Sequence, residues 1–120
     1  MTTIKESLQR LSGIEGYWGS ALIDAESGMV LGQDGSGPVN LEVAGASNAE
    51  VVRAKRKAMR NLNIKDDIED ILISLTKQYH LIRPLRSKTT LFFYVVLDRS
   101  RANLAMARMT LAESEKELIV

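Results

Sequence analysis

Few side chains in this sequence are of the types that perform catalysis. Its 120 residues include no cysteine and a single histidine, His80. The chain therefore has no thiolate nucleophile and no multi-histidine metal site. His80 lies between Tyr79 and Leu81 in a predicted strand, where a histidine that faces solvent or a partner is more common than a catalytic base. Because no nucleophile–base or acid–base set can be assembled, we expect a protein that is not an enzyme and has neither catalytic nor metal-binding residues.

Two patterns that suggest ligand binding are incomplete. Four carboxylates lie close together, at Asp66, Asp67, Glu69 and Asp70. Hard cations favour such oxygen ligands, but this spacing matches no known cation-binding loop, and we interpret the cluster as a solvated entry to a strand. Glycines at residues 28–37 suggest a phosphate-binding loop, but no lysine follows them and Pro38 precedes the next predicted helix. We expect a flexible connection at 34–38 and no cofactor.

The strongest charge feature is a run of five cations with no acid among them. It consists of Arg53, Lys55, Arg56, Lys57 and Arg60. All except Lys55 fall at i, i+3, i+4 and i+7, which is one face of a helix. Three interpretations stay open: a solvated face, a patch for an acidic protein or membrane surface, and a nucleic-acid site. The net charge of +1 disfavours nucleic acid. We take Arg53, Arg56, Lys57 and Arg60 as candidate partner-docking residues.

The composition and the hydropathy pattern indicate one globular α+β domain. The chain is 45% hydrophobic and 26% charged, and no apolar run is long enough to span a bilayer. The amino-terminal residues do not form a secretory signal, so we expect a cytoplasmic protein. A capping box at Thr3 and Glu6 starts a short helix that ends at Gly13. Further helices are predicted at 41–62 and 100–117, and strands at 17–24, 29–33, 68–76, 78–85 and 89–98.

The predicted order is α-β-β-α-β-β-β-α, and the short joins between consecutive strands predict a mainly antiparallel sheet. Strand 89–98 is apolar on both faces, which predicts a central position. Strand 68–76 is an apolar edge that would promote aggregation unless it is paired. Small residues at 43–47 have two explanations of equal weight: packing of the long helix on its own sheet, or a helix–helix contact across a symmetric dimer.

Four segments carry a more specific pattern. They are residues 14–24 (IEGYWGSALID), 28–32 (GMVLG), 79–85 (YHLIRPL) and 102–108 (ANLAMAR). Together and in this order they resemble the roadblock/dynein light chain family, over about residues 3–115. The resemblance implies a single roadblock-like domain over residues 1–120. Its five-stranded antiparallel sheet would carry the long helix on one face and the two terminal helices on the other, with Asn103 at the start of the last helix.

The resemblance also implies an assembly and a role. Family members are homodimers or heterodimers whose third strands pair edge to edge and whose long helices pack side by side. Such dimers are platforms for Ras-like small GTPases or adaptor subunits in motor and signalling complexes. Bacterial members include GTPase-activating partners of a gliding-motility switch protein, in which the platform arranges the catalytic residues of the GTPase itself.

Our leading hypothesis is therefore a non-enzymatic homodimeric regulator or adaptor that docks a Ras-like small GTPase. The residues predicted at the dimer interface are Ala44, Ser47, Asn48, Val51, Ile71, Ile73 and Leu75. One alternative is a sensory module for a small ligand, with a pocket lined by Trp18, Met59 and Tyr94. Another is a structural subunit of a larger adaptor complex.

Overall fold

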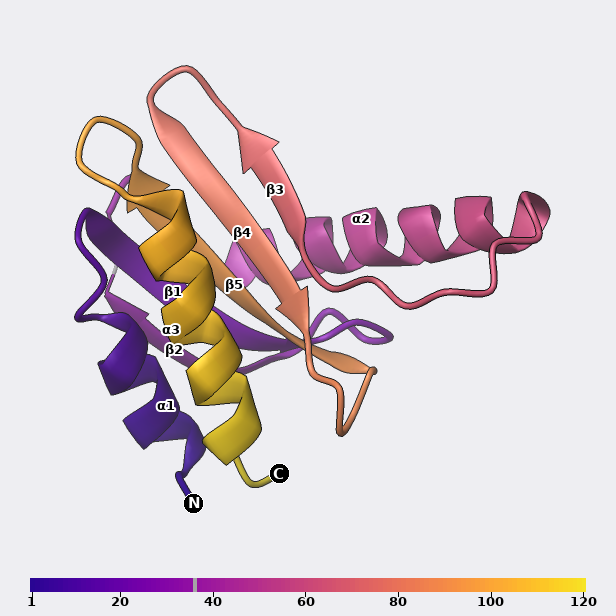
Figure 1. Ribbon diagram of the computed structural model, residues 1–120, viewed down its shortest axis with the longest axis horizontal. Coiled ribbons are helices and arrows are strands. Elements are labelled where there is room, and N and C mark those ends of the chain that lie inside the picture. Colours follow the sequence, from indigo (N-terminus) through magenta and orange to yellow (C-terminus); the bar gives the residue numbers. More distant parts are fainter. Residues whose placement is uncertain (36) are drawn as a thin grey trace.

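The computed structural model describes residues 1–35 and 37–120 and has the predicted order of elements (Figure 1). The helices are α1 (Ile4–Leu11), α2 (Leu41–Asn61) and α3 (Leu104–Glu117). The strands are β1 (Tyr17–Asp24), β2 (Val30–Gly35), β3 (Ile71–Ser74), β4 (Gln78–Pro84) and β5 (Leu91–Asp98). Residue 36, in the connection predicted at 34–38, lies outside the described residues.

The five strands form one antiparallel sheet in the order β2-β1-β5-β4-β3. Its central strand is β5, in which every residue from Leu91 to Leu97 is buried, and this confirms the position predicted from its apolar run. Helices α1 and α3 cover one face, above a core that includes Leu22, Leu81 and Phe93. Helix α2 covers the other face, so the predicted α+β fold is confirmed.

Strand β3 is shorter than the predicted 68–76, because residues 64–70 form no regular structure and Leu75 already belongs to the turn. The cause lies in the neighbouring strand. Leu75 donates its N–H to Gln78, so the even-numbered residues of β4 have their backbone groups directed at β3. The ladder ends at the Ile71–Ile82 pair, and Pro84 is the next residue of β4 that faces β3. Pro84 has no N–H to donate, which prevents the ladder from continuing.

Helix α3 also starts later than predicted, at Leu104 instead of Ser100. Asn103 is its N-cap, and the Asn103 Oδ1 atom accepts a hydrogen bond from the N–H of Met106 at 3.2 Å. An N-cap has extended rather than helical backbone, so the helix begins one residue further on. The structural role inferred for Asn103 at the helix start is confirmed.

The small residues at 43–47 are explained largely by packing of α2 on its own β1–β2 hairpin. A Cβ atom on Gly45 would lie 2.7 Å from Val30 Cγ2 and 2.9 Å from the carbonyl oxygen of Gly28. Gly28 has φ +76°, and a Cβ atom there would lie 3.0 Å from the Cα of Ala46. Both positions require glycine because the helix and the hairpin turn approach so closely.

Candidate interaction surface

Helix α2 is only half supported by its own chain. Its buried residues end at Val52, and the rest of the helix extends past β3, beyond the margin of the sheet (Figure 1). An isolated helical segment of this length is marginal in water unless an apolar face is covered. The projecting half of α2 and the adjacent edge of β3 therefore define a candidate interaction surface.

One side of α2 is small and apolar. At about 3.6 residues per turn, Ser47, Val51, Ala54 and Ala58 fall on this side, which we call the small-residue flank. Ser47 and Ala54 are exposed, and Val51 and Ala58 are partly exposed. Within this flank, Val51 lies on the β3 side, because it lines a groove of about 520 Å³ together with Ile68 and Ile71. Sequence reasoning missed Ala54 and Ala58, although their spacing from Ser47 and Val51 is helical.

The residues predicted at a dimer interface divide into two groups. Ala44 and Asn48 are only 7% and 8% exposed, and Asn48 Nδ2 donates a 2.8 Å hydrogen bond to the Ala44 carbonyl within the helix. Ala44 packs in the core between α2 and the sheet, and Asn48 is buried on the same side of the helix, so both leave little surface for a partner. The other five remain accessible at the β3 side. Of these, Ser47 and Leu75 are exposed and Val51, Ile71 and Ile73 are partly exposed.

The edge of β3 has free backbone groups. Leu75 donates to Gln78 and the register of β3 with β4 runs in steps of one residue, so Ile71 and Ile73 bond to β4. The alternate residues, Leu72 and Ser74, therefore direct their N–H and C=O groups away from the sheet. Another strand can pair with this edge.

A second side of α2 carries Arg53, Arg56, Lys57 and Arg60, which we call the basic flank. Arg53 Nη1 donates to the backbone carbonyl of Ala25 at 2.5 Å, and Arg56 Nη2 donates to that of Thr89 at 2.7 Å. Neutral carbonyls hold these guanidinium groups in place without cancelling their charge. The three ion pairs in the described part of the chain involve none of these four residues. The structure thus brings the four predicted docking residues together on one side of α2.

His80 belongs to a partly buried hydrogen-bond chain. Its Nδ1 lies 3.0 Å from the Tyr94 hydroxyl and its Nε2 lies 2.7 Å from Gln78 Oε1. Burial lowers the pKa of His80 and raises the pKa of Tyr94 to about 12. His80 therefore contacts Tyr94 and Gln78 of its own sheet, whereas the sequence predicted a histidine that faces solvent or a partner.

The four clustered acidic residues lie on the irregular segment that leads into β3. Among the described residues, no group of three or more histidine, cysteine or acidic side chains can hold an ion. Asp70 accepts a 3.0 Å hydrogen bond from Arg108 Nε on α3, which ties the segment before β3 to that helix. Asp66 and Asp67 are exposed, as expected for a solvated connection.

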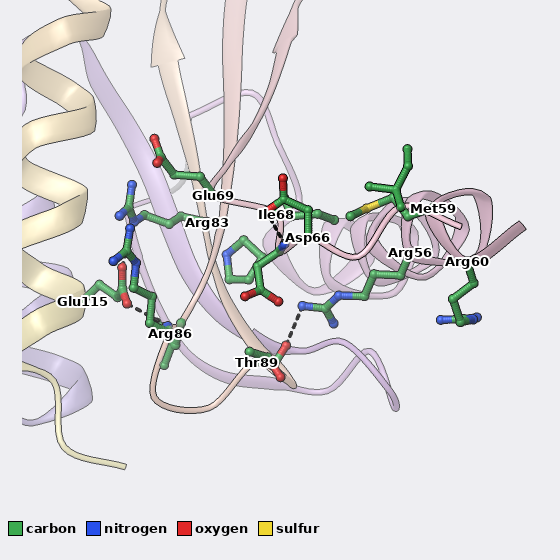
Figure 2. Close-up of a pocket in the computed structure, with 14 residues that line it drawn as sticks. Arg56, Met59, Arg60, Asp66, Ile68, Glu69, Arg83, Arg86, Thr89 and Glu115 are labelled. Carbon is green, nitrogen blue, oxygen red and sulfur yellow. Dashed lines mark hydrogen bonds and ion pairs between the residues drawn. The ribbon is translucent and has the colours of Figure 1, made fainter. Parts of the chain in front are cut away.

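The pocket expected for a small-ligand sensor is not built from the predicted residues. Tyr94 is 1% exposed inside the core, and Trp18 packs at the start of β1 against the α2-side core. Of these three residues, Met59 lines a cleft in the described part of the chain. This cleft has a volume of about 600 Å³ and lies between the projecting half of α2, residues 64–69, the end of β4 and α3 (Figure 2).

No protein-family model and no curated protein matches the sequence. Solved structures match it closely in fold. MglB from Myxococcus xanthus superposes with a TM-score of 0.82 at 15% identity, over 95% of this chain and 89% of that one. A roadblock/LC7 domain from Streptomyces avermitilis gives a TM-score of 0.81 at 13% identity, over 96% and 93% of the two chains. The gliding protein MglB from Thermus thermophilus gives 0.72 at 18% identity, over 95% and 89%.

The molecule is thus an α+β protein with an open sheet edge and a projecting helix, and its fold is that of roadblock/LC7 domains. The resemblance inferred from the sequence is confirmed at the level of the fold. None of the helices in residues 1–35 and 37–120 is long and apolar enough to cross a membrane.

Proposed function

We propose that two copies of this chain pair through β3 and the small-residue flank of α2, and that the paired helices dock a Ras-like small GTPase. The observation that carries the proposal is the combination of a free β3 edge with a helix that extends beyond that same edge. A free edge alone accepts any strand, and a projecting helix alone accepts any apolar surface. A second copy of the chain satisfies both at once.

The backbone supports a symmetric pairing about Ile73. With the two-fold axis at this residue, Leu72 of each copy lies opposite Ser74 of the other, and the four outward N–H groups meet four outward carbonyls. An axis perpendicular to the sheet keeps both α2 helices on the same face. Each projecting helix then crosses over the sheet of the other copy, and its small-residue flank allows a close approach.

The basic flank supports the docking part of the proposal. It lies on a different side of α2 from the small-residue flank, so pairing leaves its four cations accessible. Their unpaired charges suit a partner with an acidic surface and favour its rapid association. The sequence resemblance to the roadblock family suggests that this partner is a small GTPase. The role is regulatory, because the chain supplies no catalytic set of its own.

Two measurements test the two parts separately. Light scattering over a range of concentrations detects pairing, and a protein that stays monomeric at micromolar concentration contradicts it. Docking is tested by titration against purified Ras-like GTPases in their GDP and GTP-analogue forms. Reversal of Lys57 and Arg60 to Glu should abolish binding, while the same reversal of Lys5 and Lys116, which are exposed on α1 and α3, should not. Equal losses for both pairs contradict docking on the basic flank.

A further inference from the structure

The cleft beside the end of β4 exists because β3 is short. Residues 64–69 do not continue the sheet, so Arg83, Pro84 and Leu85 at the end of β4 lack a neighbouring strand on one side and line the cleft instead. Its volume of about 600 Å³ lies within the range of small-molecule sites. The residues that line it include Arg56 and Arg60 of the basic flank.

The inner end of the cleft holds a buried ion pair. Arg83 Nε donates to Glu115 Oε1 at 2.9 Å, and the two side chains are only 8% and 5% exposed. The backbone N–H of Arg86 donates to the other carboxylate oxygen, Glu115 Oε2, at 2.7 Å. Figure 2 shows Glu115 between these two arginines at one end of the cleft. Both oxygens of Glu115 are therefore occupied within the protein.

The guanidinium of Arg83, unlike the Glu115 carboxylate, does not use all of its hydrogen-bonding groups within the described residues. In the part of the chain that the structure describes, its guanidinium makes one hydrogen bond, through Nε, and both Nη groups lack a protein acceptor. Neither Nη atom is among the buried polar atoms that lack a partner in the described residues, so both remain accessible to solvent from the cleft. A guanidinium with two free Nη groups matches the spacing of two oxygens on a carboxylate or phosphate.

Other arginines reinforce this arrangement. Arg56 and Arg60 of α2 line the opposite side of the cleft, and the Arg86 side chain lines it next to Arg83 (Figure 2). The carboxylates of Asp66, Asp67 and Glu69 line the cleft too, on the irregular segment 64–69. These three residues are largely exposed, so solvent screens their repulsion of an anion more than it screens the attraction between an anion and the buried Arg83.

We propose that this cleft is a binding site for a small oxyanion ligand, whose phosphate or carboxylate group bonds to the free Nη groups of Arg83 and to the Arg86 side chain. The buried ion pair with Glu115 fixes Arg83 for this contact. The acidic segment 64–69 limits affinity, and the anion binds at the end of the cleft that holds Arg83 and Arg86.

The test is calorimetric titration of the purified protein with inorganic phosphate and, separately, with succinate, against sodium chloride of equal ionic strength. Saturable binding of one of these anions supports the site and identifies the preferred oxyanion. Arg86→Gln should weaken binding about tenfold, the effect of losing one charge-assisted contact. Arg101→Gln removes the same charge from an exposed position outside the cleft and should leave binding unchanged.

Two further variants separate this site from general charge attraction. Arg83→Lys keeps the charge but removes the fork of two donors, so it should weaken binding at least as much as Arg86→Gln. Glu69→Gln removes a repelling charge from the rim and should strengthen binding. The proposal is overturned if neither anion binds saturably, if Arg101→Gln costs as much as Arg86→Gln, or if the folded Arg83→Lys and Arg86→Gln variants both bind like the wild type.

Discussion

The β3 edge offers a substitution that separates pairing from folding. Ser74 is exposed, and its N–H points away from β4, so Ser74→Pro removes a donor that the single chain does not use. In the symmetric pairing about Ile73, each copy loses one of its two outward donors, and two of the four inter-chain bonds disappear. Each bond contributes about 0.5–1.5 kcal/mol net, so association weakens by about 1–3 kcal/mol, or roughly 5- to 150-fold in the dissociation constant.

Sedimentation equilibrium measures this dissociation constant directly. Ser74→Thr is the matched control, because it keeps the N–H and a β-compatible side chain and should associate like the wild type. Circular dichroism and urea denaturation of the monomeric fraction establish that the proline variant still folds. A folded Ser74→Pro protein with the association constant of the wild type refutes pairing through β3, whatever the helices do.

Three other substitutions test the packing of the single chain. Gly45→Ala improves helix propensity but forces a methyl group against Val30, so the free energy of unfolding measured in urea should decrease by about 1–3 kcal/mol. An increase would contradict the tight packing of the helix on the hairpin. Asn103→Ala removes the N-cap of α3 and should cost about 0.5–2 kcal/mol, whereas Asn103→Ser should recover most of it. Burial lowers the pKa of His80, so the unfolded chain binds a proton at a higher pH than the folded chain does. The free energy of unfolding should therefore decrease as the pH is lowered below about 6.5. His80→Gln should lack this decline, and equal pH profiles of the two proteins would contradict the shift.

Local patterns in the sequence were sufficient for most of the fold. The capping box at Thr3 and Glu6 forms as predicted, with the Glu6 N–H bonded to Thr3 Oγ1 at 3.2 Å. The uninterrupted apolar run of β5 identified the central strand, because only a strand covered on both faces is apolar on both. Such features depend on neighbours in the chain, and sequence reasoning handles them well.

The errors arise where the cause is distant in sequence. The shortened β3 results from Pro84, which lies on another strand and acts only through the register of that pair. Glu115 appears in the sequence as one charged helix residue among several, and only the fold buries it against Arg83. The interface role of Ala44 and Asn48 stays a prediction, because periodicity alone does not indicate where the sheet ends beneath their helix face.

Helix α2 has separate sides for the proposed self-association and the proposed partner binding. Val51 on the small-residue flank and Lys57 on the basic flank are about 120° apart around the helix axis. The sheet occupies the third side, where Val52 is fully buried. A partner copy on the first flank therefore does not compete with an acidic protein on the second. Because a two-fold axis repeats the basic flank, a symmetric pair presents two copies of it, and the geometry of the pair decides whether one partner molecule contacts both.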